Sequence, residues 1–393
     1  MSYRAGRSQG SHRGRAGSTA AARTVATRTM ATRTVATRTI ATLTTAALAA
    51  AVARASYAAL KRRPPGGAGT WTRTNHCGEP VTLLEGPALA IAAIAAPALG
   101  SGLSPRVRAA LAVAGTGAAA FGGYDDLAGD GDRRGFRGHL GALAHGEVTT
   151  GAVKLGGIGT TGLVAAAVLG GAPADVAINT GLVAGGANLL NLFDLRPGRA
   201  IKVALASGAL LALSARGGTP PSRRQAPGPQ GPEPPDGLKA PVTSSLGSWP
   251  PARGSGPPEL REGTGQMVAG PLGASVALLG EDLGERAMLG DAGANALGAL
   301  LGVAAAASLP RPARVALLAG IAGLTAASEK VSFTAVIERT PALRWLDMLG
   351  RRPVPAAPVP GRPAGPLPAH EGEAGHTAAA AVLAPTPPPR PTP

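Results

Sequence analysis

Residues 155–193 read LGGIGTTGLVAAAVLGGAPADVAINTGLVAGGANLLNLF, and this stretch decides the fold class. Its single charged residue, Asp175, divides it into two apolar runs, residues 155–174 and 176–193. A helix needs about 20 predominantly apolar residues to cross a bilayer. Two such runs joined by a short turn therefore predict a pair of membrane helices.

Seven further runs of low charge flank this pair. They cover residues 41–60 (broken only by Arg54), 87–104, 109–124, 203–215, 267–280, 292–310 and 315–328. Their many Ala and Gly residues suit close contacts between membrane helices. The sequence therefore predicts an all-α fold, a polytopic transmembrane helical bundle of about nine spans, with a soluble Ala-rich helical array as the alternative.

The composition agrees with a membrane protein. Charged residues make up 15% of the chain and aromatic residues 3%, whereas a soluble domain carries about 25% charged residues. Because Cys77 is the only cysteine, an intrachain disulfide framework and a multi-cysteine metal site are excluded. These figures disfavour a large secreted enzyme and an ordinary cytosolic one.

The net charge of +16 is concentrated at the N-terminus, where residues 1–63 hold twelve Lys and Arg and no acid. An ATRTV-type pentad repeats there, with a period that fits neither helix nor strand. Without aromatic residues or a recognition motif, the tail does not indicate nucleic-acid binding. We expect five segments: a disordered basic tail (1–40), two membrane halves (41–215 and 266–352), a Pro/Gly-rich linker (216–265) and a disordered Pro-rich tail (353–393).

Lys and Arg in the short loops predict the orientation. They gather in the loops at 61–86, 125–150 and 194–202 and in the segment after Ser328, which alternate correctly along nine spans. These loops are therefore expected in the cytoplasm of a cell whose plasma membrane the chain crosses. The N-terminal tail is the exception, since the same alternation places its arginines outside.

Three polar clusters follow at the predicted cytoplasmic ends of spans. The first is the pair Asp125 and Asp126, the second is Asn188, Asn191 and Asp194, and the third is Asp291 between two glycines. Acids in or beside a membrane are costly and point to function, and such oxygen ligands suit Mg²⁺ together with substrate phosphates. Several nearby basic residues could hold anionic oxygens: Lys154, His139, His145, Arg134 and Arg137.

The order and spacing of these clusters resemble the polyprenyl-phosphate N-acetylhexosamine-1-phosphate transferases, which include phospho-N-acetylmuramoyl-pentapeptide transferase and the related GlcNAc-1-phosphate transferases. The resemblance covers residues 60–328 without the linker. It is carried by the DD pair at Asp125 and Asp126, the later Lys154, the N-x-x-N-x-x-D motif at 188–194 and the G-D-x-G motif at 290–293.

This resemblance implies Mg²⁺-assisted attack by polyprenyl phosphate on the β-phosphorus of a UDP-sugar, with release of UMP, as in cell-wall precursor synthesis. It implies that Asp291, together with Asp125, binds the metal. Asp125 and Asp126 would bind or deprotonate the lipid phosphate, and Lys154 would steady phosphate charge. The nucleotide-sugar would be positioned by Asn188, Asn191 and Asp194.

Two departures leave another function open. Asp194 is followed by Leu195, Arg196, Pro197 and Gly198 where the family continues G-x-D-G, so the second Asp is lost. No histidine lies between His145 and His370, where the family has a His-rich loop. A non-catalytic relative that binds lipid phosphate or organises cell-wall enzymes is the main alternative, and a small-solute transporter is a weaker one. The sequence leaves the oligomeric state open, with a homodimer as one option.

In place of the His-rich loop, residues 329–352 alternate apolar and basic residues around Trp345, which predicts an amphipathic interfacial helix.

Overall fold

The computed structural model describes residues 12–75, 77–100, 102–129, 145, 149–216 and 263–352, with side chains of the first helix described from residue 36. Most of the predicted linker and the whole C-terminal tail lie outside these residues. The described elements are almost all helices, and the all-α prediction is confirmed. In chain order they are α1 (His12–Arg62), α2 (Ala68–Trp71), β1 (Thr72–Thr74), β2 (Pro80–Thr82), α3 (Glu85–Leu99), α4 (Pro105–Ala128), α6 (Thr150–Leu169), α7 (Pro173–Phe193), α8 (Arg199–Arg216), α10 (Thr264–Leu283), α11 (Gly290–Ser308), α12 (Arg311–Ser328), α13 (Phe333–Arg339) and α14 (Pro341–Met348).

Each of the nine apolar runs forms a helix, but the structure supports fewer membrane spans than nine. Within the described residues, three helices are long and apolar enough to cross a membrane: the Ala36–Arg62 part of α1, α6 and α7. A fourth results if α12 and α13, which meet at a 93° bend, count as one broken span. The other helices miss this limit because Ala and Gly lower their mean hydropathy, because charges stand at their ends, or because α3 has only 15 residues.

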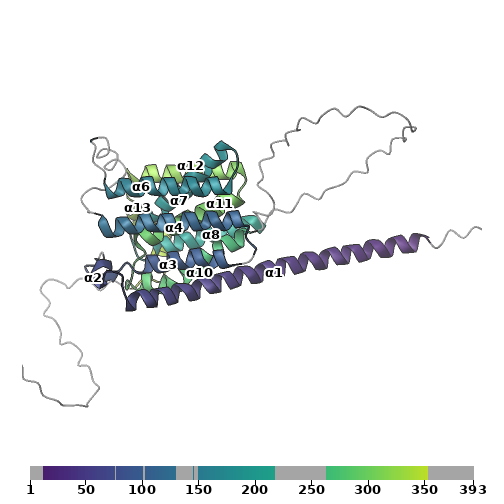
Figure 1. Cartoon of the computed structure of the whole chain (residues 1–393), viewed down its shortest axis with the longest axis horizontal. Helices are drawn as coiled ribbons and strands as arrows, with labels where there is room; N and C mark the ends of the chain where they lie inside the picture. The colour runs from purple at the N-terminus through teal and green to yellow at the C-terminus, as the bar shows by residue number, and fades with distance from the viewer. Residues whose placement is uncertain are drawn as a thin grey trace, which may run out of the picture. The chain divides into compact units, whose positions relative to one another are not determined.

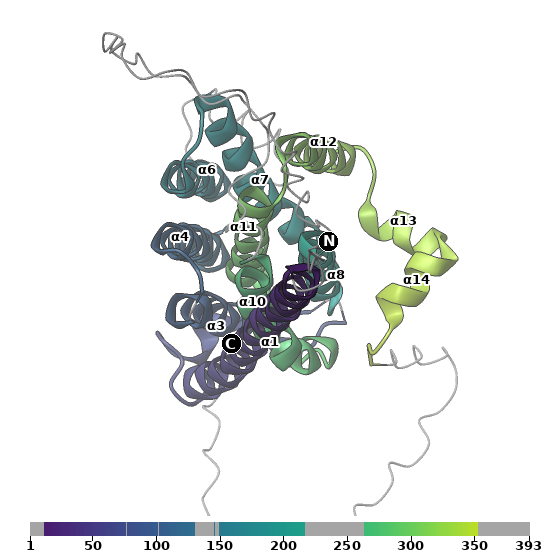
Figure 2. The same cartoon turned by 90° about the vertical axis from the view of Figure 1, so that its right-hand side faces the viewer.

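α11 forms the centre of the bundle. Every residue of α11 is buried except Asp291 in its first turn. Figure 2, an end-on view, shows α11 enclosed by its neighbours, and contacts run from it to α3, α4, α6, α7, α8 and α10. Burial on all sides explains why α11 is made almost wholly of Ala, Gly, Leu and Val.

Small residues allow α7 and α11 to touch at the backbone. A Cβ atom at Gly298 would lie 2.1 Å from the carbonyl oxygen of Gly186. One turn along, a Cβ atom at Gly302 would lie 2.5 Å from the carbonyl oxygen of Leu182. The abundance of glycine in these runs is therefore a packing requirement of this helix pair, as expected for small residues in helix interfaces.

Successive long helices alternate in direction. The C-terminal end of α4, the N-terminal end of α6 and the N-terminal end of α11 meet at one end of the bundle, here called the site end, through Asp125, Lys154 and Asp291. At the opposite end, Arg314 of α12 donates hydrogen bonds to Asp175 and Asn179 of α7. The loops predicted to be rich in Lys and Arg begin and end at the site end, as alternation of the spans requires.

The structure differs from the sequence expectation at the N-terminus. α1 is one continuous helix of 51 residues that includes the pentad repeat, whereas a disordered tail was expected over residues 1–40. Residues 18–63 contain neither Pro nor Gly, so no helix-breaking residue interrupts this part of α1. Its contacts with the bundle are made to α3 and α10. A small hairpin that the sequence did not predict follows, in which β1 pairs antiparallel with β2 and Arg73 faces Val81.

Candidate functional site

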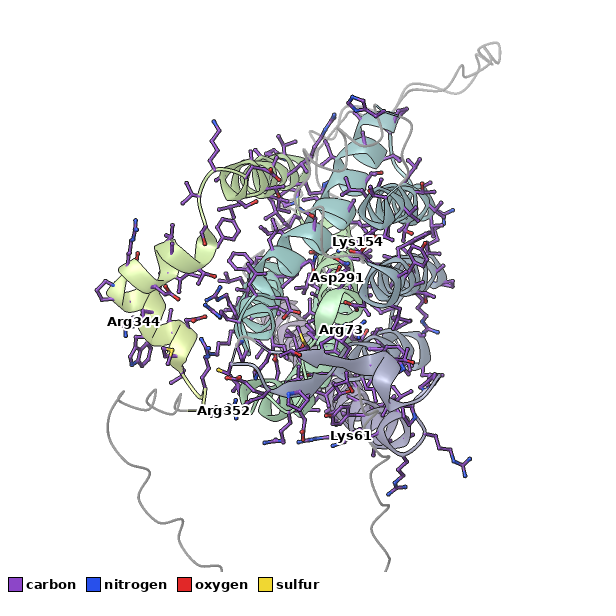
Figure 3. All side chains as sticks on the ribbon, turned by 90° about the vertical axis from the view of Figure 1, so that its left-hand side faces the viewer. Lys61, Arg73, Lys154, Asp291, Arg344 and Arg352 are labelled. Carbon is purple, nitrogen blue, oxygen red and sulfur yellow. The ribbon has the colours of Figure 1, made fainter. Side chains whose placement is uncertain are left out.

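Three of the predicted site residues meet at the site end. The Lys154 ammonium of α6 lies between two carboxylates, with its Nζ atom 3.1 Å from Oδ2 of Asp125 on α4 and in an ion pair with Oδ2 of Asp291 on α11. Figure 3 shows Lys154 and Asp291 side by side. Their side chains are only 13% and 25% exposed. Residues separated by up to 166 positions in the chain therefore form one partly shielded charge cluster.

Helix ends set the position of this cluster. Asp125 lies in the last turn of α4, Lys154 near the start of α6, and Asp291 in the first turn of α11. Because these helices run in alternate directions, their termini meet at the same level. An acid in the first turn of a helix is also favoured by the helix dipole.

Asp126 joins α4 to the start of α11. Its two carboxylate oxygens accept hydrogen bonds from the backbone N–H groups of Asp291 and Ala292, each at 2.9 Å. These N–H groups have no acceptor within their own helix, so Asp126 acts as a cap supplied by a different helix. Arg73 of β1 in turn donates to the backbone carbonyl of Asp126. Asp126 therefore holds the first turn of α11, and with it Asp291, in position against α4.

A glycine makes this approach of α4 and α11 feasible. A Cβ atom at Gly122 would lie 2.3 Å from the carbonyl oxygen of Asp291 and 2.8 Å from the amide nitrogen of Asn295. Asn295 lies one turn after Asp291 on the same face of α11, and it is fully buried. Neither polar atom of its side chain has a hydrogen-bond partner among the described residues.

Asp194 belongs to the same end of the bundle. It follows the last residue of α7 as its C-cap. Burial, followed by the charges of Asp282, Asp291 and Asp126, raises the pKa of the Asp194 carboxyl well above its ordinary value. Asp194 therefore lies at the same end of the bundle as Asp126 and Asp291, so that residues of all three polar clusters occur at the site end.

Asn188 and Asn191 lie on a different face of α7 from the one that packs on α11. Gly162 of α6 packs against Thr180 and Ala184, and Asn188 and Asn191 follow Ala184 by one and two turns on that face. Since α6 and α7 are antiparallel, this direction leads toward the turn of α6 that carries Lys154. Both side chains are partly exposed. The two amides and Asp194, the C-cap of α7, thus lie on the α7 side of the cluster.

Two acids at this end were not singled out in the sequence. Glu85, the first residue of α3, is fully buried, and neither of its carboxylate oxygens has a hydrogen-bond partner in the described part of the chain. Asp282 near the end of α10 is 2% exposed, and one of its oxygens accepts from the backbone N–H of Gly198 at 3.0 Å. The sequence could have indicated both acids by their position, because each lies at the border of an uncharged run, as Asp125 and Asp291 do.

The remaining basic candidates contribute less to the described site. Arg134, Arg137 and His139 lie outside the described residues, and His145 is exposed. The described surroundings of Lys154 are therefore rich in carboxyl groups. Lys154 is the cation that contacts Asp125 and Asp291, while Asp126, Asp194, Asp282 and Glu85 add further carboxyl groups.

The donor set suits a hard cation bound by few protein ligands. Within the described residues, no group of three or more His, Cys, Asp or Glu side chains is arranged to hold a metal ion. Two carboxylates, Asp125 and Asp291, do converge on one cation position, which the Lys154 ammonium takes. This fits Mg²⁺, which proteins commonly bind through one or two carboxylates plus substrate phosphates and water.

Comparisons with known proteins add no relative. A scan against models of known protein families finds no match to the chain. A search of the curated proteins likewise finds no similar sequence. The order of the motifs and the geometry of the site end are therefore the observations that bear on function.

Proposed function

We propose that the chain is a membrane transferase that moves a sugar-1-phosphate from a UDP-N-acetylhexosamine to polyprenyl phosphate, with Mg²⁺ as its cofactor. The observation that carries the proposal is the convergence of Asp125 and Asp291 on Lys154. The motifs that contain these residues are far apart in the sequence. If each motif resembled the family only by chance, there would be no reason for their side chains to lie together in the fold.

The reaction is a displacement at phosphorus. A phosphate oxygen of polyprenyl phosphate forms a bond to the β-phosphorus of the UDP-sugar, the bond from that phosphorus to the bridging oxygen breaks, and UMP leaves. A bound Mg²⁺ would supply neutralisation of the charge on the diphosphate.

The protein groups would then have distinct tasks. Asp291 and Asp125 would hold the metal, and Lys154, freed from them, would bind a phosphate oxygen. Asp126 keeps Asp291 in place through the first backbone N–H groups of α11. Asn188 and Asn191, whose side chains are partly exposed beside α6, would bind the nucleotide-sugar together with Asp194.

The membrane setting of the proposal rests on the helices that are long and apolar enough to span. We propose that all nine long helices cross the plasma membrane, because they alternate in direction between the same two ends. The site end would face the cytoplasm, since Lys61 lies in the last turn of α1 there and Arg196 and Lys330 lie in its loops. UDP-sugars are made in that compartment, so donor and site would meet there.

A non-catalytic relative that binds lipid phosphate is the second candidate. It is favoured by the sequence departures after Asp194 and by the absence of a histidine between His145 and His370. In that case Lys154 would still bind phosphate, but no donor would be cleaved. Such a protein could organise cell-wall enzymes around the lipid.

One assay separates the two. The purified chain in detergent is incubated with polyprenyl phosphate and a panel of UDP-sugars, with and without Mg²⁺, and UMP is measured. The transferase proposal expects UMP with at least one donor and only when both lipid phosphate and Mg²⁺ are present. Saturable binding of polyprenyl phosphate without UMP from any donor would support the non-catalytic relative instead.

A further inference from the structure

The segment after α12 has its polarity inverted. We call residues 329–352, which include α13 and α14, the arm. In α14 the buried residue is the acid Asp347, whereas Trp345 and Leu346 are 65% and 51% exposed, and Leu349, which directly follows α14, is 54% exposed. A helix on the surface of a water-soluble protein buries the opposite set. A cluster of exposed apolar side chains of this kind marks a surface that contacts another apolar phase.

The arm is held in this orientation by buried charge. The Arg199 guanidinium at the start of α8 donates to both carboxylate oxygens of Asp347, at 2.7 and 3.2 Å. Arg351 adds a third contact at 3.1 Å, and Lys202 donates to the backbone carbonyl of Asp347 at 2.6 Å. On α13, the ring of Phe333 stacks on Phe193 at the end of α7 with centroids 5.2 Å apart. The outward direction of Trp345 is thus fixed by contacts to the bundle, and Figure 2 shows the arm along one side of it.

The outer surface of the arm carries a hollow with two arginines. Its volume is about 460 Å³, and it is lined by Glu338, Arg339, Pro341, Arg344, Trp345 and Met348. Figure 3 places Arg344 well apart from the Lys154–Asp291 cluster. Glu338 lies 3.9 Å from Arg196. Neither Arg339 nor Arg344 contacts a carboxylate within the described residues, so both guanidinium groups are available to an anion.

We propose that the arm lies on the membrane surface at the site end and that this hollow binds the phosphate of an anionic phospholipid headgroup. Two guanidinium groups match a phosphate, the Trp345 ring suits the boundary between headgroups and acyl chains, and Met348 and Leu349 extend that surface with apolar area. The proposal requires that the bundle spans a membrane. It does not depend on transferase activity.

Quenching of Trp345 fluorescence by brominated phospholipids tests the proposal. The full chain, with Trp71→Phe and Trp249→Phe so that Trp345 is the one remaining tryptophan, is placed in proteoliposomes of neutral phosphatidylcholine or of phosphatidylcholine with phosphatidylglycerol. In one set of vesicles only the neutral lipid is brominated near the headgroup, and in the other only the anionic lipid is. We expect stronger quenching by the anionic lipid at equal mole fraction, with a preference that falls about fivefold for each of Arg339→Gln and Arg344→Gln.

The control is Arg63→Gln, which removes one exposed positive charge at the same end of the bundle but outside the arm. It should leave the preference unchanged. Equal quenching by neutral and anionic lipid, or a preference that survives both arm substitutions, would overturn the headgroup site. Protection of Trp345 from every lipid would overturn the membrane contact, and would point to coverage by another protein surface. UMP formation can succeed or fail independently of all these outcomes.

Discussion

Asp126 at the end of α4 caps α11 by accepting the backbone N–H groups of Asp291 and Ala292, each at 2.9 Å. This contact links the DD pair to the G-D-x-G motif, which lie furthest apart in the sequence among the motifs of the site. It makes the position of the Asp291 carboxylate depend on a residue that need not touch substrate itself.

Substitution of Asp126 therefore tests the cap. Asp126→Ala removes both acceptors, and we expect it to lower the free energy of unfolding by about 1–2 kcal/mol, the range found for lost N-caps. Asp126→Asn keeps one acceptor oxygen and should lose less. Thermal unfolding of the purified chain in detergent gives the comparison, and equal stability of the Ala variant and the unaltered chain would contradict the capping role.

Lys154→Met tests the cation position between Asp125 and Asp291. Without the ammonium, the two carboxylates repel each other, so the variant should unfold at a lower temperature than the unaltered chain. Because Mg²⁺ can then enter without displacing Lys154, it should raise the unfolding temperature of Lys154→Met more than that of the unaltered chain. An equal Mg²⁺ effect in a variant that also carries Asp125→Asn and Asp291→Asn would show that the ion binds elsewhere.

Gly298→Leu tests the close contact of α7 and α11. A side chain there meets the backbone of Gly186, where a Cβ atom would lie 2.1 Å from the carbonyl oxygen. We expect a loss of stability of about 1–3 kcal/mol, as for overpacked cores. The matched control is Gly320→Leu on α12, where a Cβ atom would meet no atom within 4 Å; it should unfold like the unaltered chain, and similar losses in both variants would contradict the packing argument.

Acidification tests the attachment of the arm. Burial favours the neutral form of Asp347, but the hydrogen bond from Arg199 and the charges of Arg199, Arg351 and Lys202 outweigh it and lower the pKa of the carboxyl. A pKa that is lower in the folded state gives stability that is present at neutral pH and is lost as the pH falls through the depressed pKa. The arm should therefore detach below about pH 4, the ordinary range of an Asp carboxyl.

Emission from a chain with Trp345 as its only tryptophan, recorded in detergent from pH 7 to pH 3, follows this release. Asp347→Asn should show the released signal already at pH 7, because Arg199 and Arg351 lose their counter-charge. Asp175→Asn, which removes an acid at the opposite end, should keep the transition. A transition in Asp347→Asn at the same pH would assign it to another group.

The sequence predicts the helices well because apolar runs and their charged borders are local signals. All nine runs became helices, and Asp125, Lys154 and Asp291 meet at one end as the alternation of spans requires. The number of spans was less predictable, since Ala and Gly pack tightly without being strongly hydrophobic. α11 is buried by protein except at Asp291, so its apolar composition reflects packing against neighbouring helices rather than contact with lipid.

Other features depend on long-range contacts and left no local signal. The β1–β2 hairpin is tied to the start of α11 by Met288, whose backbone N–H donates to the carbonyl of Thr82. Nothing in the spacing of Asp126 shows that it caps a helix 165 positions away. The spacing of Asn188, Asn191 and Asp194 likewise does not show that α7 ends at Phe193, so that Asp194 is its C-cap while the two amides lie within the helix.

The central claim is most directly tested by Asp291→Asn in the UMP assay, with Asp175→Asn as the matched control. Both variants replace one carboxylate by an amide, the first in the Lys154 cluster and the second beside Arg314 at the opposite end. The account predicts that Asp291→Asn lowers Mg²⁺-dependent UMP release by about 100-fold or more, while Asp175→Asn retains it. Unchanged turnover in Asp291→Asn would contradict the account.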